Sequence, residues 1–203
     1  MHHGVTSIKQ RLELIAQRID LSVREPQKSI NGQQYMLKDF THEIIRGTRQ
    51  TGPASESEPM EACFRFVRYG LENREDPADY DYYMSAGRAI NSGAGDCDDK
   101  VILLNAMLSS IGYTTGARVC SPDGGGWHIY TIIGVNPAFN GMPSGVIAMD
   151  PRYGDEVGWE PADKYRRFER ECTFNKGRVV GYKSIRNGGG LFSFLQAAGL
   201  PGM

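Results

Sequence analysis

The sequence predicts an α+β protein in which helices come first and an antiparallel sheet follows. Apolar residues recur at helical spacing in the N-terminal part of the 203-residue chain. After residue 113 the pattern changes to short strand-like runs, rich in β-branched residues, that are separated by glycine- and proline-containing turns. Helical segments followed by consecutive strands are typical of α+β architectures.

Three helices are expected before residue 72. The first is predicted over residues 7–23, with a cap from Thr6 or Ser7 and one apolar face made of Ile8, Leu12, Ile15 and Ile19. A second is predicted near residues 34–46, and a third runs to about residue 71 with Ser57 as its cap. Residues 48–58 are expected to form an exposed loop, and residues 73–92 an ordered loop rich in tyrosine.

A loop of small residues then leads into a cysteine and an apolar helix, predicted over residues 97–111 with Gly112 as its C-terminal cap. Cys97 would lie in the first turn, where unpaired backbone N–H groups carry about half a positive charge. A thiolate is stabilised in such a place. Asp98 and Asp99 favour the helix dipole but oppose thiolate formation. Alternatively, Cys97 is a small apolar core residue.

Strands are expected over residues 114–120, 127–135 and 145–149. Residues 121–126 and 136–144 are predicted to be turns or loops. Residues 160–170 are predicted to form a charged turn or short helix, and residues 173–185 one or two further strands.

Two strand residues complete a candidate site. His128 lies in the second predicted strand, and alternation predicts that it faces the Cys97 helix while Trp127 and Ile129 face away. Asp150 ends the next strand and could hydrogen-bond one imidazole nitrogen, which leaves the other free to face sulfur. The alternatives are a structural histidine and a turn-forming aspartate before Pro151.

The composition argues against several function classes. A net charge of -1 gives no electrostatic case for nucleic acid or acidic membranes, and no apolar run is long enough to span a bilayer. Four scattered cysteines do not resemble a disulfide framework, and no secretory signal is visible, so reduced thiols in a cytoplasmic setting are expected. Zinc at Cys97, Asp96 and His128 lacks the usual ligand spacing, so no metal or cofactor is expected.

The run Gly95-Asp96-Cys97-Asp98-Asp99 resembles the core of the transglutaminase-like superfamily of papain-fold cysteine enzymes. Residues 127–130 (Trp-His-Ile-Tyr) and 149–151 (Met-Asp-Pro) resemble its second and third motifs, in the same order. The resemblance covers about residues 61–161 and is similar to stand-alone members found in bacteriophages and prophages. It implies a papain/transglutaminase-like core with Cys97 as nucleophile, His128 as base and Asp150 as orienting residue.

One feature departs from that superfamily. Relatives often carry a glutamine about a dozen residues before the cysteine, whereas Met84, Ser85 and Ala86 stand here. The oxyanion would then rely on the backbone N–H of Cys97 and on a side chain in the cleft. The candidates for that side chain are Tyr82, Tyr83 and Trp127.

The chain is expected to be one domain over residues 1–187, with a helical part (1–60), a catalytic core (61–161) and an extension (162–187). A glycine-hinged apolar tail (188–203) follows. Two functions are compatible with this organisation. The first is a cysteine-dependent peptidase, amidase or transglutaminase-type enzyme acting on a protein or peptide in the host cytoplasm. The second is a non-enzymatic, virion-associated protein of a phage-like particle, whose tail docks on a structural partner through the run from Leu191 to Leu195.

Overall fold

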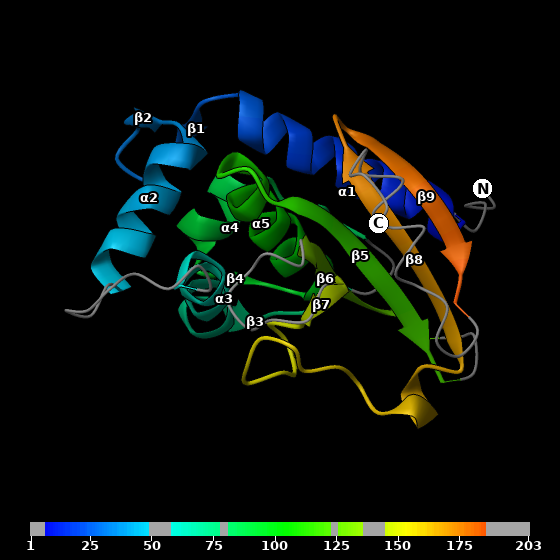
Figure 1. Cartoon of the computed structure of the whole chain (residues 1–203). Helices are drawn as coiled ribbons and strands as arrows, with labels where there is room; N and C mark the ends of the chain where they lie inside the picture. Colours follow the sequence, from blue (N-terminus) through cyan, green and yellow to red (C-terminus); the bar gives the residue numbers. More distant parts are fainter. Residues whose placement is uncertain (1–6, 49–57, 78–80, 123–125, 136–144, 186–203) are drawn as a thin grey trace, which may run out of the picture.

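The computed structural model describes residues 7–48, 58–77, 81–122, 126–135 and 145–185, and its architecture is α+β (Figure 1). N-terminal helices pack on a five-stranded antiparallel sheet, as the sequence predicted. No helix in the described ranges has the length and apolar character needed to cross a bilayer. The predicted domain division stays a prediction, and the predicted tail lies outside the described residues.

The first three helices fall close to their predicted positions. Helix α1 (Ile8–Arg24) begins at Ser7, whose side chain accepts a hydrogen bond from the Gln10 N–H while the Gln10 side chain returns one to Ser7. Helix α2 (Leu37–Thr48) begins three residues later than predicted. The reason is that β2 (Gln34–Tyr35) pairs with β1 (Gln27–Lys28) instead of entering the helix. Helix α3 spans Glu58–Gly70, and its predicted cap Ser57 lies outside the described residues.

The tyrosine-rich segment contains a helix that the sequence analysis missed. Helix α4 (Ala86–Ser92) is capped by the Ser85 hydroxyl and ends at Gly93, whose φ of 61° is left-handed. The prediction of a loop is therefore wrong over these residues. Beside the helix, β3 (Glu72–Asn73) pairs in parallel with β4 (Ala94–Gly95), which fixes the chain just before Cys97.

Helix α5 (Cys97–Ser110) is the centre of the molecule. Every residue from Asp99 to Leu108 is buried, because the helix contacts the other helices on several sides and β5 and β6 on another (Figure 1). Even Lys100 is fully buried, and its Nζ atom donates to the Leu71 carbonyl (3.0 Å) and to Asn73 Oδ1 (2.7 Å). The helix therefore holds its first residue, Cys97, on a rigid support.

The sheet has the strand order β7-β6-β5-β8-β9 and is antiparallel throughout. Its strands are β5 (Thr114–Ser121), β6 (His128–Val135), β7 (Gly145–Met149), β8 (Phe168–Asn175) and β9 (Arg178–Ser184). The first three lie where they were predicted. In the charged segment only Asp163–Tyr165 form a short 3-10 helix, and β8 begins five residues before the predicted start of 173.

The two faces of the sheet are covered differently. One face packs against α5 and the main apolar core. The other carries a small cluster of Cys120, Tyr130, Ile132 and Ala148. The segment after β7 folds over this second face, where Glu160 pairs with Arg118 of β5 and with Arg166. The start of that segment, at Asp150, therefore lies at the edge of β6.

Candidate active site

Cys97 is held at the N-terminus of α5 by a tight local structure. Asp96 caps the helix, since its Oδ1 atom accepts hydrogen bonds from the N–H groups of Asp98 (3.1 Å) and Asp99 (3.3 Å). Gly95 packs so closely that an added Cβ would lie 2.7 Å from Asp99 Cβ. Any larger residue at position 95 would push α5 or β4 out of place.

His128 and Asp150 form a direct contact, in which His128 Nε2 lies 2.6 Å from Asp150 Oδ2. Asp150 is completely buried, and its other oxygen accepts hydrogen bonds from the N–H groups of Arg152 (2.9 Å) and Tyr153 (3.2 Å). With both oxygens engaged, the carboxylate has a fixed orientation. The geometry therefore favours the tautomer with the proton on Nε2, which leaves Nδ1 as an acceptor.

The predicted orientation of the strand residues is wrong. Ile129 belongs to the core on the α5 side, and the Thr131 hydroxyl accepts a hydrogen bond from Asn105 of α5 (2.8 Å). His128 instead lies opposite Cys120 in the ladder and stacks on Tyr130, whose side chain lies on the second face. Alternation could not decide between the faces, because apolar residues occupy both sets of positions in β6.

The Cys97 thiol lies beside the backbone of β6. The N–H of Ile129 donates a hydrogen bond to the Cys97 sulfur. The last residue of β7, Met149, pairs with Thr131, so β7 leaves the first residues of β6 without a neighbour on that side. Cys97 and His128 consequently line the same small cavity of about 70 Å³.

The remaining walls of this cavity come from distant parts of the chain. Helix α1 contributes an apolar wall, and Arg11 of that helix pairs with Asp81 at 2.8 Å. Of the three predicted cleft residues, Tyr83 and Trp127 line the cavity. Tyr82 does not line it: the side chain is 43% exposed, and the Arg88 guanidinium lies over its ring. A volume of 70 Å³ is too small for a peptide, and four residues of α1 line this cavity beside the thiol.

The environment of Cys97 opposes ionisation. Burial, aided by the nearby carboxylates of Asp98 and Asp96, raises the pKa of the thiol to about 12. The Ile129 N–H and the positive charge of Arg152 act in the opposite direction but are weaker. The expected thiolate stabilisation by the helix N-terminus is therefore outweighed by burial and by the acidic residues.

Three carboxylates beside the thiol form an acidic cluster, made of Asp96, Asp98 and Asp99, whose oxygens lie within 4.8 Å of one another. Burial, aided by the neighbouring acidic groups, raises the pKa of Asp98 to about 10 and that of Asp99 to about 7. One buried oxygen of Asp98 has no hydrogen-bond partner. The cluster could share protons, or it could hold a hard cation such as Ca²⁺, which prefers oxygen ligands.

Sequence reasoning missed two residues at this site. Arg152 and Tyr153 follow the Asp150-Pro151 step, and the Tyr153 ring lies against the His128 ring. The Asp-Pro-Arg-Tyr-Gly run at 150–154 signals a turn. That signal could have shown that residues 152 and 153 return to the carboxylate of Asp150.

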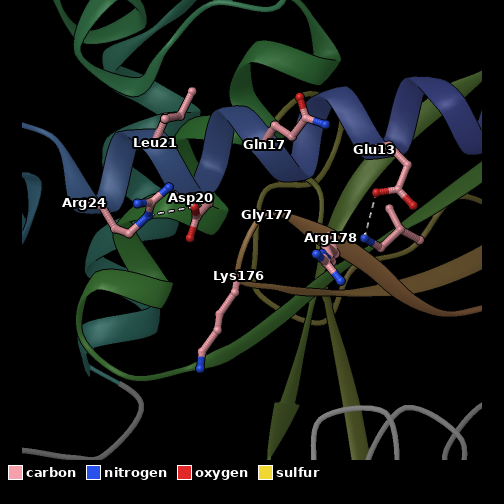
Figure 2. Close-up of a pocket in the computed structure, with 9 residues that line it drawn as sticks. Glu13, Gln17, Asp20, Leu21, Arg24, Lys176, Gly177 and Arg178 are labelled. Atoms are coloured by element: carbon pink, nitrogen blue, oxygen red, sulfur yellow. Dashed lines mark hydrogen bonds and ion pairs between the residues drawn. The ribbon is translucent and has the colours of Figure 1, made fainter.

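A larger hollow of about 550 Å³ lies between α1 and the turn that joins β8 to β9 (Figure 2). Its walls carry charges of both signs, and Glu13 accepts a hydrogen bond from the N–H of Val179 (3.1 Å). Asp20 pairs with Arg24 of the same helix. None of the predicted site residues lines this hollow.

Comparison with known proteins gives distant structural likenesses. No protein-family model and no curated protein sequence matches the chain. A structure of Legionella pneumophila LapG is 18% identical with a TM-score of 0.44, over 58% of this chain and 62% of that chain. Calcium-bound LapG is 17% identical with a TM-score of 0.49, over 79% of this chain and 86% of that chain. A candidate protease of Parabacteroides distasonis is 14% identical with a TM-score of 0.44, over 83% of this chain and 30% of that chain.

The chain thus spans less than two thirds of the first LapG structure and of the Parabacteroides protein. At this level of similarity no family is assigned to the chain.

Proposed function

We propose that this protein is a transglutaminase-like, cysteine-dependent enzyme that cleaves or transfers amide-linked acyl groups of a protein or peptide. Cys97 is the nucleophile, His128 the general base and Asp150 the residue that orients His128. The observation that carries the proposal is the His128–Asp150 hydrogen bond of 2.6 Å, at a cavity that Cys97 also lines. The three residue types in this arrangement are those of a cysteine triad.

The proposed reaction starts from His128 with its proton on Nε2, so that Nδ1 is free to accept a proton. His128 Nδ1 accepts the thiol proton of Cys97 while sulfur bonds to the substrate carbonyl carbon, whose π electrons move to oxygen. When the carbonyl re-forms, the C–N bond breaks and the imidazolium returns its proton to the departing nitrogen. The thioester is then resolved by water, which gives an acid, or by an amine, which gives a new amide.

The developing oxyanion needs donors that are already in place. The backbone N–H of Cys97 supplies one, because the first N–H groups of a helix have no partner within it. Trp127 and Tyr83 line the cavity, and either side chain could supply a second. With no glutamine before the helix, a slow enzyme is expected, since one lost donor costs on the order of 3 kcal/mol in the transition state.

Because Cys97 is buried, we expect its thiol proton to move to His128 at the moment when the sulfur attacks the substrate carbonyl. A thiol with a pKa of about 12 is almost fully protonated at neutral pH, so the thiolate must form as the carbonyl approaches. His128 is held ready for that transfer by Asp150. The enzyme would therefore show little reactivity toward simple alkylating agents before a substrate opens the cavity.

The test is a Cys97→Ala variant assayed on a fluorescent casein and on incorporation of a fluorescent amine. Peptidase or amidase action predicts release of casein fragments, and transglutaminase action predicts labelling of casein by the amine. Cys120→Ala, a buried cysteine on the second face, is the matched control. Loss of either activity in the first variant but not in the second supports the proposal. Activity that survives Cys97→Ala would disprove it.

The second candidate is a non-enzymatic, structural protein of a phage-like particle in the host cell or the virion. The observation that favours it is the missing glutamine, together with the apolar run at residues 191–195. Deleting residues 188–203 separates the two functions. Loss of assembly or partner binding with unchanged amide chemistry would favour the structural role, whereas full assembly without the tail would rule it out.

A further inference from the structure

The turn after β7 is built around the carboxylate of Asp150. One oxygen contacts His128, and the other accepts the N–H groups of Arg152 and Tyr153. The N–H of Gly154 closes the turn on the Asp150 carbonyl at 2.9 Å. The turn that holds Asp150 against His128 therefore also carries Tyr153.

Two tyrosines flank the imidazole of His128. Tyr130 lies in the neighbouring position of the same strand face, with ring centroids 6.0 Å apart and planes at 25°. Tyr153 meets the ring with its edge, at 4.9 Å and 64°. Tyr130 is fully buried and its hydroxyl donates to Glu169 at 3.1 Å, so this side is rigid. The packing on the other side of the imidazole comes from Tyr153.

Tyr153 is 53% exposed, so burial alone does not hold its ring. The guanidinium of Arg152 lies 5.1 Å from the ring centroid, at cation–π distance. Arg152 is itself largely buried and forms an ion pair with Glu75. The ring is thus held between a fixed cation and the imidazole.

The backbone of the turn has no freedom to relax. A Cβ at Gly154 would lie 3.0 Å from the Asp150 carbonyl oxygen and 3.1 Å from Trp159 Cβ. Gly154 therefore lies tightly between Trp159 and the Asp150 carbonyl. The close packing of the turn fixes the backbone from which the Tyr153 side chain extends.

We propose that Tyr153 is a positioning residue for His128: its ring packs against the imidazole, shields the His128–Asp150 hydrogen bond from water and keeps Nδ1 directed toward the cavity. This role rests on the proposed function of His128 as a base. It requires the aromatic ring and not the hydroxyl, since no hydrogen bond of the Tyr153 hydroxyl to His128 or Asp150 is present in the described residues.

The test compares Tyr153→Phe with Tyr153→Ala by ¹⁵N NMR of the histidine ring nitrogens. The wild-type protein and Tyr153→Phe are expected to show His128 as the single tautomer protonated at Nε2. Tyr153→Ala is expected to show exchange-broadened signals that move toward the average of both tautomers. Tyr69→Ala removes a 62%-exposed tyrosine that does not touch His128, and it should leave the spectrum unchanged.

The NMR measurement also separates this inference from the proposed function. A wild-type spectrum in Tyr153→Ala would overturn the positioning role, and so would equal broadening in Tyr153→Phe. If the tautomer shift occurs as expected but no amide chemistry is found, Tyr153 orients His128 and the proposed function is wrong. If amide chemistry is found, Tyr153→Ala should lower kcat about 10-fold or more with little change in KM, and Tyr153→Phe should match the wild type.

Discussion

The imidazole Nε2 atom of His128 lies 2.6 Å from Oδ2 of the fully buried Asp150, across the edge where β7 ends beside β6. This contact favours the histidine tautomer that carries its proton on Nε2. It leaves a single imidazole nitrogen to serve the cavity that Cys97 lines.

Asp150→Asn should keep the fold but reverse the histidine tautomer. An asparagine oxygen can still accept the N–H groups of Arg152 and Tyr153, but its NH₂ group then faces His128 Nε2 and forces the proton onto Nδ1. Any amide activity should fall by about 10²- to 10⁴-fold, and Tm should change little. Kinetics and thermal melts check this outcome. Full activity in the variant would show that Asp150 has no orienting role.

Asp98→Asn should remove a pH dependence of stability. The pKa of Asp98 is about 10 in the folded protein and near 3.9 when unfolded, so the folded state binds the extra proton between these values. The free energy of unfolding of the wild type should therefore fall as the pH rises from about 4 to 10. The variant should show a flatter curve in urea melts at each pH, and the exposed Asp163→Asn should follow the wild type.

Thermal melts of the same proteins with millimolar Ca²⁺ test whether the acidic cluster binds this cation. A rise in Tm that the wild type shows and Asp98→Asn lacks would mean that the cluster binds calcium. An unchanged Tm would mean that the cluster does not bind calcium.

Lys100→Met should change the dependence of stability on pH in the alkaline range. Burial lowers the pKa of Lys100 to about 8, so between about pH 8 and 10.5 the unfolded chain binds more protons than the folded one. The Lys100 contribution thus raises wild-type stability over that range, by on the order of 1–3 kcal/mol. Urea melts of Lys100→Met should lack this rise, whereas the exposed Lys9→Met should retain it. Parallel curves for all three proteins would contradict the prediction.

Gly95→Ala should destabilise the protein by about 1–3 kcal/mol, since the new methyl group would overlap Asp99 Cβ at 2.7 Å. Gly47→Ala is the matched control. Gly47 is the second-last residue of α2, and an added Cβ there would meet open space, so alanine should stabilise by up to about 0.5–1 kcal/mol. Urea denaturation of both variants measures the difference, and equal effects would show that position 95 tolerates a side chain.

Arg11→Ala should expose Cys97 more often. Helix α1 lines the cavity, and the Arg11–Asp81 pair ties its first turns to the tyrosine-rich segment. An exposed pair of this kind contributes about 0.2–1 kcal/mol, so alkylation of Cys97 by iodoacetamide should become up to about fivefold faster. Arg24→Ala, at the far end of α1, should leave the rate unchanged. Mass spectrometry of the Cys97 peptide gives both rates.

The sequence predicted the elements whose local signals agree with their packing. The small-residue loop before Cys97 and the apolar run after it predicted α5, and the Asp-Pro step predicted the end of β7. Helix α4 was missed even though Ser85 and Gly93 cap it, because three tyrosines, several acidic residues and Pro77 precede it.

The sequence suggested which residues could form a site, but it did not show the environment in which they lie. Cys97, His128 and Asp150 were identified as a set, and their roles remain a proposal. The sequence could not show which residues of β6 face α5, since Ile129 and Ile132 make both faces of the strand apolar. The cavity wall that α1 forms and the packing of Tyr153 on His128 join residues far apart in the chain, which no local pattern reveals.

Because α5 is buried on every side from Asp99 to Leu108, its amide hydrogens should be the last in the molecule to exchange with solvent deuterium. Amides in such a helix exchange only when the whole domain opens, so their exchange rate reports global unfolding. Cys97 stands at the first turn of that slowest-exchanging element. Cys97, the proposed nucleophile, would therefore stay in place when only part of the fold opens, while α1 could lift away from it.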